Sequence, residues 1–69
     1  MFEKVNLVMF IEALDPKYKT LVALGERTHY IFSDGDEIAV GWAQLFDVVE
    51  IVSENFDSIV VRIEYVDEE

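Results

Sequence analysis

Cysteine is absent from these 69 residues, and His29 is the only histidine. Disulfides and thiolate metal sites are therefore excluded, and a tetrahedral zinc site lacks its four nitrogen or sulfur ligands. We predict that the protein uses no cofactor and no metal ion. A chain this short lies near the lower size limit for one apolar core. We therefore predict a single domain over residues 1–69, stabilised by packing and helped by self-association.

The residues that nucleophilic catalysis needs are equally scarce. An activated serine requires a neighbouring base, and His29, placed in a predicted strand, is the only histidine that could serve the three serines. The three glycines match neither the dinucleotide-binding nor the phosphate-binding loop pattern. The acidic run at 34–37 lacks the rest of a calcium-binding loop, and a turn that caps a helix explains it better. We predict that the protein is not an enzyme.

Basic side chains are few and lie mostly at one end of the chain. The net charge is -10, from 15 acidic residues against 5 lysines and arginines. Residues 1–27 carry 4 acids and 4 bases, whereas residues 28–69 carry 11 acids and only Arg62. Direct binding to nucleic acid or to anionic membranes is disfavoured, because both require a basic surface. The charge favours a basic protein partner.

Long apolar runs are missing too, although the chain as a whole is rich in apolar residues. The apolar N-terminal segment is too short and too interrupted to cross a bilayer, and no cleavage site follows it. We therefore expect a cytoplasmic protein. The apolar content is 52%, above the usual share of about 45–50%. We expect part of this excess to form a surface for a partner.

The hydrophobic pattern predicts a small α+β domain of order β-β-β-α-β. Residues 4–14, 18–24, 27–33 and 58–66 are predicted strands, the first and last with apolar residues alternating between two faces. The first three strands should form an antiparallel meander, because their connections are short. One amphipathic helix over residues 36–54 should pack on one face of this antiparallel sheet.

The helix prediction depends on one stripe of apolar residues. Their spacing of 4, 3, 4, 3 and 4 is typical of a helix, and they are Ile38, Trp42, Leu45, Val49, Val52 and Phe56. The alternative is a pair of strands, favoured by the valines and isoleucines and by a possible turn at residues 34–35. If this segment forms two strands, its acidic residues do not gather on the outer face of one helix.

Two surfaces are candidates for binding. The outer face of the predicted helix carries acids of one sign with interspersed aliphatic residues, a combination that favours protein binding over a purely solvated face. The candidate partner-binding residues are Asp36, Glu37, Val40, Asp47, Glu50, Ile51 and Glu54. The sheet face away from the helix is the candidate homodimer interface, with Val8, Phe10, Val60 and Val66.

These observations favour a non-enzymatic protein-binding module, an acidic inhibitor or adaptor that occupies the basic surface of a nucleic-acid-handling protein. In size and charge alone, the chain resembles the DNA-mimic proteins that phages and other mobile elements encode. The alternative is a structural or assembly subunit that homo-oligomerises through an apolar sheet face. Its negative charge would then serve only solubility.

Overall fold

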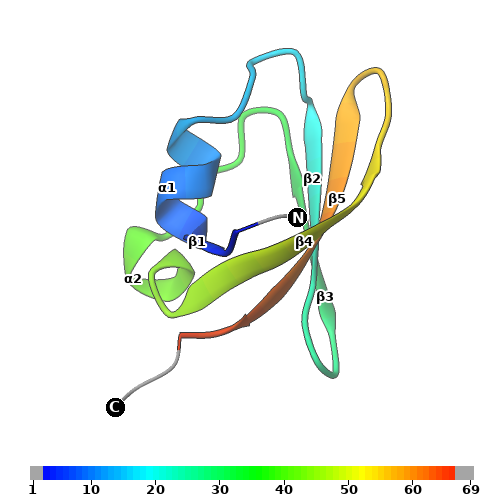
Figure 1. Ribbon diagram of the computed structural model, residues 1–69. Coiled ribbons are helices and arrows are strands. Elements are labelled where there is room, and N and C mark those ends of the chain that lie inside the picture. The colour runs from blue at the N-terminus through cyan, green and yellow to red at the C-terminus, as the bar shows by residue number, and fades with distance from the viewer. Residues whose placement is uncertain (1–2, 67–69) are drawn as a thin grey trace.

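The computed structural model describes residues 3–66, which form a five-stranded mixed sheet with two short helices on one side (Figure 1). The strand order is β1-β4-β5-β2-β3, in which β2 and β5 are parallel and the other neighbours antiparallel. A small α+β fold is thus confirmed, while the order of the strands differs from the prediction. The elements are β1 (Val5–Asn6), α1 (Leu7–Glu12), β2 (Thr20–Leu24), β3 (His29–Ser33), α2 (Val40–Ala43), β4 (Phe46–Glu54) and β5 (Ser58–Tyr65).

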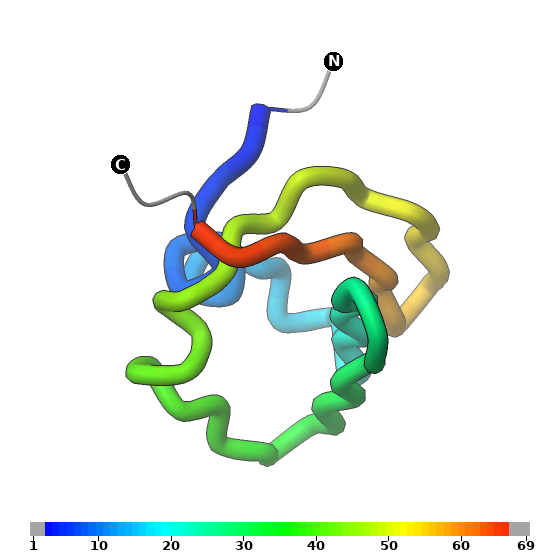
Figure 2. Tube along the Cα trace, turned by 90° about the horizontal axis from the view of Figure 1, so that it is seen from below, coloured from blue at the N-terminus to red at the C-terminus, as the bar shows by residue number. Residues whose placement is uncertain are grey.

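The core lies between the helices and the inward face of the sheet. Leu7 of α1 and Ala43 of α2 are buried against inward-facing residues of β2, β4 and β5. Seen from below in Figure 2, β4 and β5 run along one flank, and the segment from β3 to α2 curves round the other. The strand residues of the core are Leu21, Ala23, Phe46, Val48, Ile59, Val61 and Ile63.

The prediction of a strand over residues 4–14 is wrong, because most of that segment is helical. Only the two residues of β1 pair with β4 before α1 begins. The Asn6 side chain accepts a hydrogen bond from the Val8 backbone N–H at 3.1 Å and caps the helix. Leu7, Phe10 and Ile11 recur at helical spacing and pack on the core side. The predicted meander is therefore replaced by β1 beside β4 and β2 beside β5.

The prediction of a helix over residues 36–54 is also wrong. Only the four residues of α2 are helical, and β4 follows them. Register shifts interrupt the pairing of β4 with β5 between Val48 and Glu50 and between Ile51 and Ser53. Each bulge adds a residue to the strand and displaces the alternation. Val49 and Val52 of the predicted stripe stand at these two shifts, and their spacing of three residues therefore comes from bulges and not from a helix.

The remaining predicted strands are confirmed within about two residues at each end, which is within the usual uncertainty of element boundaries predicted from a sequence. Residues 18–24 and 27–33 contain β2 and β3, which pair as a hairpin, and residues 58–66 contain β5. Neither α1 nor α2 has the length and apolarity of a membrane-spanning helix, and residues 3–66 hold no other candidate.

Candidate functional site

The face of the sheet opposite the helices is open to solvent, and three of the four acidic residues of β4 and β5 point to it. On β5, Val60, Arg62 and Glu64 alternate with the buried core positions and therefore point to this open face. The β4 residues paired with them share the face, because directly opposite residues point the same way. These β4 residues are Ser53, Glu50 and Asp47.

Asp47 and Glu64 stand directly opposite each other in the β4–β5 ladder. Like charges at opposite positions of two strands are destabilising, and no ion pair within residues 3–66 involves either side chain. The neighbouring Arg62 donates from Nε to Glu50 Oε1 at 2.9 Å. Because Arg62 is engaged by Glu50, the Asp47–Glu64 pair has no basic partner of its own in the described structure.

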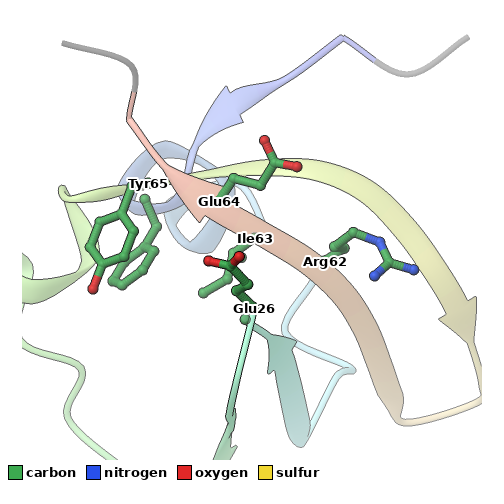
Figure 3. Close-up of a pocket in the computed structure, with 7 residues that line it drawn as sticks. Glu26, Arg62, Ile63, Glu64 and Tyr65 are labelled. Carbon is green, nitrogen blue, oxygen red and sulfur yellow. The ribbon is translucent and has the colours of Figure 1, made fainter.

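An open groove of about 530 Å³ adjoins this pair, where β5 meets the β2–β3 loop. Tyr65 is 72% exposed, and its ring centroid lies 4.7 Å from that of Phe46. Glu26 reaches the groove from the loop, while Arg62 points away from Tyr65 (Figure 3). The lining residues are Gly25, Glu26, Phe46, Arg62, Ile63, Glu64 and Tyr65.

The chemistry of this groove suits a cationic side chain. Carboxylates such as Glu26 and Glu64 form strong charge-assisted hydrogen bonds with guanidinium and ammonium groups. An exposed aromatic ring such as Tyr65 attracts the same cations through its face. No group of three histidine, aspartate or glutamate side chains in the described part of the chain is arranged to hold a metal ion.

Among the predicted partner-binding residues, the structure brings only Asp47 and Glu50 to the open face. Ile51 lies opposite Val61 and packs against the core. Glu54 lies at the far end of β4, where its carboxylate accepts a hydrogen bond from the Tyr18 hydroxyl at 2.8 Å. This hydrogen bond, with burial and the nearby acids, raises the pKa of Tyr18 above its usual 10.0.

The other three candidates lie apart from that face. Asp36 and Glu37 are exposed in the connection between β3 and α2, and Val40 is exposed on α2. The Asp36 carboxylate accepts a hydrogen bond from the Ser33 backbone N–H at 2.7 Å. This aspartate therefore stabilises a turn at the end of β3, whereas the sequence predicted the start of a helix.

The four candidate self-association residues do not share one surface. Val8 and Phe10 belong to α1 and pack on the core. Val60 lies on the open face, and Val66 follows β5 with its N–H bonded to the Leu45 carbonyl at 2.8 Å. Once residues 7–12 form a helix, Val8 and Phe10 cannot lie beside Val60 on a sheet.

Sequence reasoning missed two features. The groove combines Glu26 with Tyr65, which are far apart in the chain, and no local pattern indicates that they meet. The predicted helical stripe includes Phe56, but this residue lies in the β4–β5 turn and is 89% exposed. Its position between Asn55 and Asp57 is typical of a turn and was the available signal.

No known protein family, curated protein or solved structure matches the chain.

Proposed function

We propose that this protein is a non-enzymatic binding module that recognises a basic protein partner, and that it acts as an acidic inhibitor or adaptor of a nucleic-acid-handling protein. The observation that carries the proposal is the unneutralised pair of Asp47 and Glu64 on the open sheet face. Opposed like charges cost stability, and a cationic partner would relieve that cost on binding.

The mechanism uses the groove together with the acidic pair. Lysine or arginine side chains of the partner approach the field of a chain with net charge -10. One of them enters the groove, where it contacts the Tyr65 ring and the Glu26 carboxylate. Charge would accelerate association and set the register, and the exposed aromatic ring would supply an anchor. A partner held in this way has its own nucleic-acid-binding surface covered.

The experiment starts with capture of binding proteins from a host lysate at low salt, elution with moderate salt, and identification by mass spectrometry. Binding of the eluted protein to a DNA duplex is then measured with and without this chain. We expect inhibition by the natural sequence. The double variant Asp47→Asn, Glu64→Gln should inhibit at least about tenfold less, with most of the loss in the association rate.

A control variant of equal charge separates this site from general acidity. Glu12→Gln with Glu37→Gln also removes two negative charges, from exposed positions away from the open face. It should inhibit like the natural sequence. Equal inhibition by both double variants would refute recognition through Asp47 and Glu64.

A second candidate function is an assembly subunit that associates with itself. The observation that favours it is the regular and exposed edge of β3, which lacks the features by which proteins commonly protect sheet edges.

A further inference from the structure

The two edges of the sheet differ in how they are protected. One edge is formed by the two residues of β1 and the rest of β4, which carries two register shifts. Short strands and bulges both discourage pairing with another chain. The other edge is β3, which pairs with β2 over five residues with no register shift. It contains no proline and no lysine, so β3 is open to a further strand.

The hydrogen-bonding groups of this edge can be assigned from the ends of β3. The Ser33 N–H donates to the Asp36 carboxylate at 2.7 Å, and the Ser33 carbonyl accepts from the Asp36 N–H at 3.0 Å. Ser33 therefore points its backbone groups away from β2. Because these directions alternate along an antiparallel ladder, the backbone N–H and C=O groups of His29 and Ile31 also point away from β2. Within residues 3–66 the outward backbone groups of His29 and Ile31 have no hydrogen-bond partner outside the sheet.

The charge of this segment is unlike that of the rest of the chain. Residues 27–33 contain Arg27 and His29 and no carboxylate, in a chain of net charge -10. Ile31 is 64% exposed on the open face, next to Val22 of β2, which itself pairs with Val60 of β5. Carboxylates therefore meet this edge only at its ends, at Glu26 and at Asp34 and Asp36, and two copies can approach along the middle of β3 without opposing acids.

We propose that β3 pairs antiparallel with β3 of a second copy of this chain, about a two-fold axis at Tyr30. This register sets His29 opposite Ile31 of the second copy, and it satisfies the free backbone groups of both residues in both chains. It also sets Arg27 opposite Ser33 of the second copy, one residue from Asp34. The positive charge of Arg27 therefore lies near the negative charge of Asp34 of the second copy at each end of the interface.

The same register also sets two like charges opposite each other, and substitutions at this pair test the register. Glu26 falls opposite Asp34 of the second copy, so Glu26→Lys should tighten the dimer. Arg27→Glu should weaken it, and adding Asp34→Lys should restore it. Each effect is expected to be about two- to fivefold per copy, as for exposed ion pairs.

The experiment is sedimentation equilibrium of the full chain from micromolar to millimolar concentration. We expect a reversible dimer for the natural sequence. Ile31→Lys should raise the dissociation constant about a hundredfold, since the change enters the interface twice and tenfold per copy is a moderate loss. The control is Met9→Lys, which makes the same change on α1 at 61% exposure. It should leave the dimer intact.

Two further variants distinguish edge pairing from packing of the open sheet faces. Ile31→Pro removes only an N–H that points away from β2, a position where an edge strand tolerates proline. It should abolish the dimer, whereas Ile31→Thr, which keeps the N–H, should preserve it. The proposal is overturned if the natural sequence stays monomeric at millimolar concentration, if Met9→Lys and Ile31→Lys weaken association equally, or if Ile31→Pro dimerises normally. None of these outcomes depends on a basic partner.

Discussion

Replacing Glu64 should make this protein more stable, an unusual effect for a substitution in a folded domain. The carboxylates of Asp47 and Glu64 occupy directly opposite positions on β4 and β5. Neither has a basic partner within residues 3–66. Glu64→Gln removes the repulsion, and Glu64→Lys converts it into attraction.

The magnitude follows from the position of the pair. A cross-strand pair contributes about 0.2–1 kcal/mol in either direction, and exposure of Glu64 favours the lower half of that range. We expect Glu64→Gln to raise the free energy of unfolding by about 0.5 kcal/mol and Glu64→Lys by about 1 kcal/mol. For a domain of this size, 1 kcal/mol corresponds to a rise in Tm of about 4–8 °C.

The assay is urea and thermal unfolding at low salt, with Asp47→Asn as the second arm of a double-mutant cycle. In the Asp47→Asn background there is no opposite charge to relieve, so Glu64→Gln should have almost no effect. The gain in the natural background should also shrink at high salt, where exposed charges are screened. Equal stabilisation by Glu64→Gln in both backgrounds would refute the pairwise repulsion and leave only the general effect of net charge.

Three further predictions concern packing, backbone conformation and pH. Leu7→Ala should lower the free energy of unfolding by about 3 kcal/mol in urea titrations, because Leu7 is 0% exposed; a loss near zero would contradict its place in the core. Gly41→Ala should stabilise by up to about 1 kcal/mol, since Gly41 lies in α2 with open space around it. Gly35→Ala should destabilise by about 1 kcal/mol because φ is 92° at Gly35; equal thermal shifts in the two glycine variants would contradict this contrast. Tyr18 has a pKa raised above 10.0 by its bond to Glu54. The stabilising contribution of the Tyr18–Glu54 hydrogen bond is therefore complete below pH 10.0 and is lost as the pH rises through the raised pKa of Tyr18. Ultraviolet titration should show a lower Tyr18 pKa in the Glu54→Gln variant. An unchanged pKa would contradict the hydrogen bond.

The sequence contains the correct pattern for residues 7–14, alongside the one that predicted a strand. Leu7, Phe10, Ile11 and Leu14 follow the helical spacing of i, i+3, i+4 and i+7. Apolar residues on both sides of the segment make the alternating pattern equally visible. Asn6 decides between them, because an asparagine before an apolar run is a helix N-cap.

Residues 36–54 show the opposite error, in which a strand imitates a helix. Val49 and Val52 of the predicted stripe stand at the two register shifts of β4, so their spacing of three residues comes from bulges. The residues of β4 that face the core are Phe46, Val48 and Ile51, which the stripe does not include. The sequence did carry a counter-signal, since β-branched residues fill positions 48–52 except for Glu50. Bulges depend on the partner strand, and a single sequence does not reveal them.

The site could be predicted only in part. The acidic character of the second part of the chain, including Asp47 and Glu50, follows from composition. The opposition of Asp47 to Glu64 requires the β4–β5 register, and the groove requires the β2–β3 loop to bring Glu26 to β5. Both are long-range arrangements that local propensities do not determine.

The two proposed surfaces share only Glu26, which lines the groove and lies at the end of the β3 interface, so the acidic pair and β3 need not compete. The acidic pair is carried by β4 and β5, whereas β3 is the far edge beyond β2. A dimer through β3 would therefore keep both acidic faces free and present them on one continuous sheet. A partner with two basic surfaces at matching separation would gain affinity from such a dimer, since the second contact is intramolecular. Ile31→Lys should then weaken binding to that partner, although Ile31 touches neither the groove nor the acidic pair. A partner with a single basic surface should bind the Ile31→Lys monomer as tightly as the natural sequence.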